Sequence, residues 1–81
     1  MDKEQQLTLR LIESIELQHA AAKILLRATK RPEGDLGRPI LITMGTIALT
    51  TQLREQTDII TALLEIQRDL HAEPTSMAGL N

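Results

Sequence analysis

The second half of the chain carries one apolar stripe with helical spacing. Its members recur at alternating steps of four and three residues, and two glutamines complete the series: Leu49, Leu53, Gln56, Ile60, Leu63, Gln67 and Leu70. This alternation is the heptad spacing of a helix that lies along another helix. The pattern therefore predicts a helix over residues 46–72 whose stripe packs against a partner helix.

The first part of the chain has the pattern of one long helix over residues 2–30. Asp2 can cap its first turn, and Gln5 stands three residues later, as in a capping box. One face carries a second stripe, made of Ile12, Ile15, His19, Ala22 and Leu26. Because Leu17 and Ile24 lie largely off that stripe, the helix is apolar on more than one face, which predicts more than one neighbour.

Residues 31–39 separate the two helical patterns, with two prolines and two glycines in a short stretch. Pro32 disfavours helical geometry at Arg31, so the first helix is expected to end near Lys30. Pro39 suits the first position of the next helix, where its missing N–H has no effect.

Residues 40–48 are rich in β-branched side chains and fit either a short strand or the start of the second helix. A lone strand would have no partner in this chain, which favours a helix from Pro39, with Thr46 as the alternative start. Gly45 marks either a close approach of another backbone or a bend. Pro74 is expected to end the helix, leaving residues 74–81 as a flexible tail.

Together these elements predict an all-α fold in which residues 1–73 form one antiparallel helical hairpin. A two-helix contact cannot bury every apolar side chain of both arms. The residues expected to face outward are Leu17, Ile24, Ile59 and Ile66. Self-association into a helical bundle would bury them, and docking onto a larger protein would do so equally well.

The composition excludes several classes of function but does not identify one. The chain has 81 residues, no Cys, and no Phe, Tyr or Trp. The missing aromatic residues remove the usual stacking platform for single-stranded nucleic acid, and the net charge of −2 does not attract a phosphate backbone. No segment has the length and apolarity of a membrane span or the pattern of a signal peptide. We therefore expect a soluble, cytoplasmic protein without membrane contact.

The chemistry-bearing residues are few. Glu16 and His19 spell a single Glu-x-x-His motif of the kind found in di-iron bundles, but the other ligands that such a site needs are missing. His71, the second histidine, is expected at the far end of the other helix. No nucleophile–base arrangement is present. We expect no metal, no cofactor, no catalytic residue and no enzymatic activity.

Two polar features remain. A basic group near the connection consists of Lys23, Arg27, Lys30, Arg31 and Arg38. It is either a solvated helix end with favourable dipole charges or a contact for an anionic partner. Gln56 and Gln67 either pair across a helix interface and fix its register, or reach solvent from a slightly rotated helix.

The sequence thus favours a small helical assembly or adaptor protein that acts through protein–protein contacts, with itself as a homo-oligomer and with a larger partner. Its size and composition would suit a phage or plasmid accessory protein. The alternative is a small regulator or inhibitor whose basic turn contacts nucleic acid or an acidic protein surface.

Overall fold

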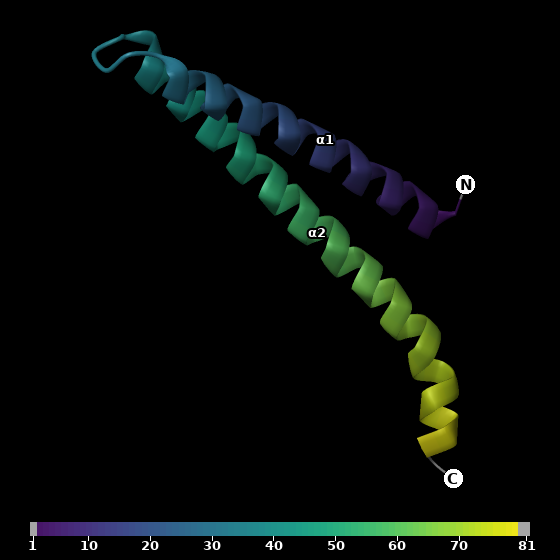
Figure 1. The fold of residues 1–81 in the computed structure, drawn as a ribbon. Helices are drawn as coiled ribbons and strands as arrows, with labels where there is room; N and C mark the ends of the chain where they lie inside the picture. Colours follow the sequence, from purple (N-terminus) through teal and green to yellow (C-terminus); the bar gives the residue numbers. More distant parts are fainter. Residues whose placement is uncertain (1, 80–81) are drawn as a thin grey trace.

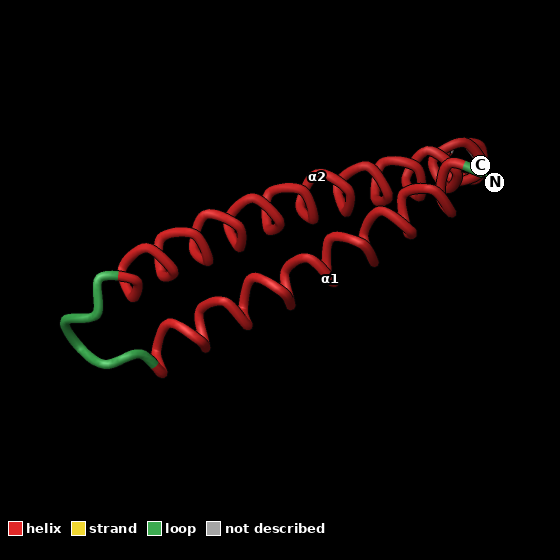
Figure 2. The backbone as a smooth tube through the Cα atoms, turned by 90° about the horizontal axis from the view of Figure 1, so that it is seen from above, coloured by secondary structure: helices red, strands yellow, loops and turns green. Residues whose placement is uncertain are grey.

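The computed structural model describes the backbone of residues 2–79 and the side chains of residues 2–71. It contains two helices, α1 (Lys3–Lys30) and α2 (Gly37–Gly79). They run antiparallel from a short connection, and α2 continues past the start of α1 (Figure 1). Figure 2 shows the same pair from above, with the connection at one end. The structure is the predicted all-α hairpin, extended to 69 × 25 × 13 Å.

The bounds of α1 agree with the signals in the sequence. The Asp2 side chain accepts a hydrogen bond from the Gln5 backbone N–H at 2.8 Å, and the Gln5 side chain accepts one from the Asp2 N–H at 3.2 Å. This reciprocal pair is a complete capping box. Arg31 is extended, with φ −79° and ψ 145°, as a residue before proline must be. Both predicted ends of the helix are therefore confirmed.

The connection is held by Asp35. Its Oδ1 accepts a hydrogen bond from the Gly37 N–H at 2.7 Å, and its Oδ2 lies 3.3 Å from Nη1 of Arg31. Gly34 adopts a φ of +86°, which an L side chain would disfavour. Helix α2 begins at Gly37, so Pro39 is its third residue and not the first as predicted. Proline fits there because the N–H groups of the whole first turn lack helical partners.

Residues 40–48 are helical, so the strand alternative is wrong. Gly45 marks a close approach of the two arms. A Cβ at this position would lie 2.8 Å from both Cγ and Cδ2 of Leu25 and 3.4 Å from the carbonyl oxygen of Ala21. The absence of a side chain therefore lets α1 and α2 pack closely near the turn.

The far end of α2 differs from the prediction. The helix continues to Gly79 and includes Pro74, although proline in a helix interior removes one backbone hydrogen bond. The expected end near residue 72 is therefore not observed. The predicted flexibility of residues 74–81 stays a prediction, and residues 80 and 81 lie outside the described part of the chain.

The two helices meet along one line of residues on each arm, which we call the contact line. These residues are buried or half-buried and again alternate in steps of four and three. On α1 they are Leu7, Leu11, Ser14, Gln18, Ala21, Leu25 and Ala28; on α2 they are Leu41, Gly45, Ala48, Gln52, Glu55, Ile59, Ala62 and Ile66. Small and polar side chains make up much of this line, so the contact between the arms is narrow.

Candidate functional site: an uncharged apolar face

Both apolar stripes of the sequence lie beside the contact line and not on it. Each stripe residue except Leu70, which lies beyond the end of the contact line, follows a contact-line residue by one position, as Leu53 follows Gln52 and Ile15 follows Ser14. One residue is a rotation of about 100° around a helix. The stripe predicted to pack on a partner helix therefore does not fill the space between α1 and α2. Leu53 is 51% exposed and Ile60 is 46% exposed.

The stripes of α1 and α2 share one side of the hairpin. Ile15, His19 and Ala22 of α1 line a shallow hollow together with Leu49 of α2 and the contact-line residue Gln18. The two stripes thus form one continuous surface, which we call the uncharged face. Its α1 residues are Thr8, Ile12, Ile15, His19, Ala22, Leu26 and Thr29; its α2 residues are Ile42, Thr46, Leu49, Leu53, Gln56, Ile60, Leu63, Gln67 and Leu70.

None of these positions holds Asp, Glu, Lys or Arg, although those four types make up 25% of the chain. The opposite side is different. The positions that precede the contact line include Arg10, Glu13, Arg27, Arg54, Asp58 and Glu65. Arg10 also forms an ion pair with Glu55 at 3.0 Å, near the edge of that side. Depletion of charge is the compositional mark of the centre of a protein interface, and it is confined to one side of this hairpin.

A polar cluster holds the middle of the hairpin. Nε2 of Gln56 donates to Oε1 of Gln18 at 2.7 Å, and the Ser14 hydroxyl donates to Oε1 of Gln52 at 2.9 Å. Ser14 is 2% exposed, so its hydrogen bond compensates a buried hydroxyl. Gln56 pairs across a helix interface, the first of the two alternatives, and it does so within one chain. Gln67 is exposed, and its Nε2 lies 3.4 Å from Nε2 of His71.

The residues expected to face outward divide into two groups. Ile59 is 2% exposed and Ile66 is half-buried, because both lie on the contact line. The expectation that they face away from α1 is wrong. Leu17 is 56% exposed and Ile24 is half-buried, and both lie on the side opposite to the uncharged face. Near the turn Met44 and Ile47 join them there, so this end of the hairpin is apolar on both sides.

Only part of the basic group is free to contact an anionic partner. Arg31 is paired with Asp35, and Nη1 of Arg38 lies 3.5 Å from the Arg31 carbonyl oxygen, to which it donates. Lys23, Arg27 and Lys30 are exposed and form no hydrogen bond or ion pair with the described residues. The structure therefore brings Arg31 and Arg38 together at the connection and leaves the other three cations along the outer surface of α1.

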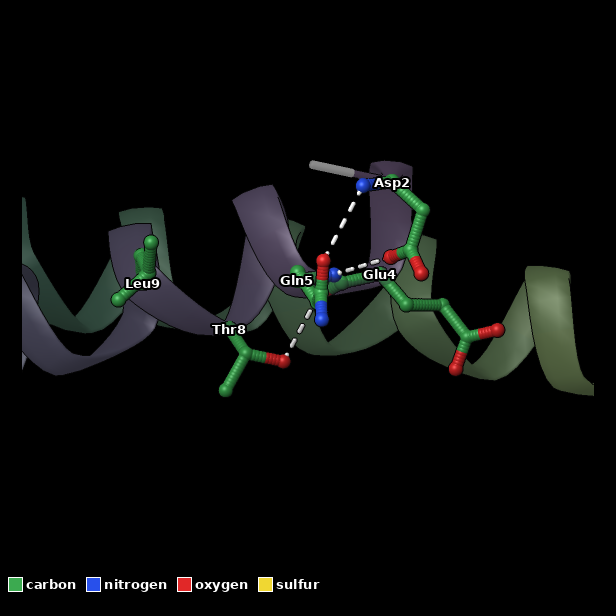
Figure 3. A pocket seen from close by; sticks show the side chains of 5 residues that line it. All are labelled: Asp2, Glu4, Gln5, Thr8 and Leu9. Carbon is green, nitrogen blue, oxygen red and sulfur yellow. Dashed lines mark hydrogen bonds between the residues drawn. The ribbon is translucent and has the colours of Figure 1, made fainter.

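The N-terminal end of α1 has a hollow lined by Asp2, Glu4, Gln5, Thr8 and Leu9 (Figure 3). The polar groups in it serve the helix: Asp2 and Gln5 form the capping box, and the Thr8 hydroxyl donates to the Glu4 carbonyl oxygen at 2.8 Å. The side-chain polar groups of Asp2, Gln5 and Thr8 are therefore already satisfied within the helix. Over the residues that the structure describes, no three metal-ligating side chains gather, at Glu16 and His19 or elsewhere.

Neither helix, over its described residues, is long and apolar enough to cross a membrane. Comparisons with known protein families, curated proteins and solved structures found no match. The uncharged face is therefore the strongest candidate site, on the basis of its own geometry and composition.

Proposed function

We propose that this protein is a non-enzymatic helical assembly or adaptor protein and that the uncharged face is its contact surface. One observation carries the proposal: large apolar side chains of both helices lie side by side on a surface without charge, while little apolar surface is buried between the helices. Among the residues that the structure describes, the buried apolar ones are Leu7, Ala21, Ala28 and Ile59. A continuous exposed apolar surface of this kind is typical of a protein–protein interaction site.

The total surface supports the same function. The chain exposes 6391 Å², whereas a compact monomer of its 9.0 kDa exposes about 4,900 Å². The difference shows that the elongated hairpin leaves more of its surface exposed than a compact fold of the same mass does.

The test compares Leu53→Asp with the matched control Leu64→Asp. Both leucines are more than half exposed in the hairpin, at 51% and 65%, but only Leu53 lies on the uncharged face. We expect Leu53→Asp to lose the contacts of the wild type, both with itself by light scattering and with proteins of its natural host by affinity capture. Leu64→Asp should retain them. Equal contacts for the two variants would contradict the proposal.

A second candidate function rests on Lys23, Arg27 and Lys30, which are exposed and unengaged by other described residues. They would allow α1 to contact nucleic acid or an acidic protein surface. Salt-dependent retention on DNA that disappears in the Lys23→Gln, Arg27→Gln, Lys30→Gln variant would favour this regulatory function.

A further inference from the structure

We infer that the occupant of the uncharged face is a second copy of this chain. The two hairpins run antiparallel, with a two-fold axis beside Gln56, and form a four-helix bundle. This inference rests on the proposed function and adds the identity and the orientation of the partner.

The order of apolar and polar residues in the stripe of α2 is the same in both directions from Gln56, with paired positions level to within one residue, about 1.5 Å. When a second α2 is laid antiparallel with the axis there, Leu53 meets Ile60, Leu49 meets Leu63, and Ile42 meets Leu70. Polar residues also meet polar residues, because Thr46 lies opposite Gln67 and Gln56 lies opposite itself. A two-fold interface requires this kind of self-complementarity, since one patch must serve both partners.

The same axis suits α1. Three side-chain hydrogen bonds, Gln18–Gln56, Ser14–Gln52 and Arg10–Glu55, place residues 10–18 of α1 beside Gln56, so the axis crosses α1 within this stretch. Ser14 lies at the middle of this stretch, and an axis beside it brings Ile12 of one copy against Ile15 of the other. Thr8 and His19 fall opposite one another in the same way. One axis thus matches apolar and polar positions on α2 and on the part of α1 from Thr8 to His19.

The unequal lengths of the helices fit this orientation. The contact line ends at Ile66, and the described side chains that follow, from Gln67 to His71, are exposed. In the antiparallel dimer this overhang of α2 reaches the turn end of the other hairpin, where Leu70 packs on Ile42. A dimer with both turns at the same end would set α2 against the shorter α1 and leave Leu70 uncovered.

A second copy also fits the charge distribution better than other occupants do. An acidic or basic partner helix would find no complementary charge on the uncharged face. A second copy presents an equally uncharged surface, and the charged side chains of both hairpins stay at the outside of the bundle. The absence of charge therefore determines that the two copies meet through the uncharged face. The order of residues in the stripe determines how the two α2 helices are aligned.

Orientation can be measured with spin labels on single cysteines, because the chain has no Cys of its own. Thr57 and Thr43 are suitable positions, since both are exposed on α2 and lie off the uncharged face. In the antiparallel dimer the two labels at position 57 are separated mainly by the packing distance of neighbouring helices, about 10 Å between axes. Those at position 43 are about 40 Å apart, from 1.5 Å per residue.

We expect a two-chain mass, a short distance at position 57 and a long distance at position 43. Similar distances at both positions would indicate a parallel dimer and overturn the inference, while leaving the proposed function intact. A single-chain mass at micromolar concentration would also overturn it; the proposed function then stands only if Leu53→Asp still abolishes capture of another protein. A two-chain mass unchanged by Leu53→Asp would overturn both.

Discussion

Gln56 and Gln18 join the two arms of the hairpin through a side-chain hydrogen bond of 2.7 Å between Nε2 and Oε1. Both residues are half-buried, and Gln56 also belongs to the uncharged face. An axial shift of either helix would break this bond, so the bond fixes the register of α1 against α2. The same register determines which residues of the two helices lie side by side on the uncharged face. A polar pair at a helix interface commonly fixes register in this way.

Removing one member of this pair should destabilise the protein. Gln18→Ala leaves the half-buried Gln56 amide without its partner, which typically costs about 1 kcal/mol. For a chain of this size the melting temperature should fall by about 4–8 °C. Glu16→Ala is the control, since Glu16 is exposed on the same helix as Gln18 but lies off the uncharged face, and it should melt like the wild type. Thermal denaturation at one fixed protein concentration makes the comparison.

Substitution of Gly45 should destabilise the protein because a side chain there would clash with Leu25. The helical conformation of Gly45 does not itself require glycine. Alanine would raise helix propensity by about 1 kcal/mol, but its Cβ would lie 2.8 Å from two atoms of Leu25, and overpacking typically costs about 1–3 kcal/mol. We expect Gly45→Ala to lower stability in the wild type. In a Leu25→Ala background the same change should raise it, as a double-mutant cycle would show. An equal effect in both backgrounds would mean that Leu25 does not limit the approach.

Asp35 should contribute more to the turn than its neighbour Glu33. It accepts the Gly37 N–H at the start of α2 and pairs with Arg31, whereas Glu33 is exposed in the same connection. Loss of a side chain that holds a helix start typically costs about 1 kcal/mol, while the exposed ion pair adds little. Urea denaturation should show a lower midpoint for Asp35→Ala than for Glu33→Ala. Equal midpoints would show that the turn forms without this bond.

The exposed cations of α1 should be dispensable for folding. Lys23, Arg27 and Lys30 have no partner among the described residues, and charges near a helix end contribute only about 0.3–1 kcal/mol each. Replacing all three with Gln should therefore change the melting curve little. If the variant loses retention on DNA while keeping its mass, the basic residues have a binding role separate from assembly. Retention that is absent in the wild type would remove nucleic acid as the partner in the second candidate function.

Much of this fold is predictable because the helix boundaries depend on local chemistry. Asp2 and Gln5 define the start of α1, and Pro32 defines its end through the geometry that it forces on Arg31. The helical state of residues 40–48 follows from the lack of a partner strand. The end of α2 is not predictable from Pro74 alone, since the helix runs through it to Gly79.

The rotation of the helices is the part that the stripes did not predict. A search for large apolar residues finds Leu53 and Ile60, whereas the arms meet one residue earlier, through Gln52 and Ile59. Small residues such as Ala21 and Gly45 allow the arms to approach there, and Ser14 and Gln52 add a buried hydrogen bond. The residues of the contact line also have heptad spacing, so the sequence does contain this line. Hydrophobicity alone, however, favours the line of leucines as the helix interface over a line of small and polar residues.

The most direct test of the central claim is the chemical accessibility of the uncharged face. Leu53→Cys and Leu64→Cys each introduce one thiol, at positions that are both more than half exposed in the isolated hairpin. Maleimide labelling at micromolar protein concentration measures whether another chain covers either position. We predict slow labelling at position 53, faster labelling there on dilution, and fast labelling at position 64 throughout. Equally fast labelling at both positions and at every concentration would contradict the claim that a second copy covers the uncharged face.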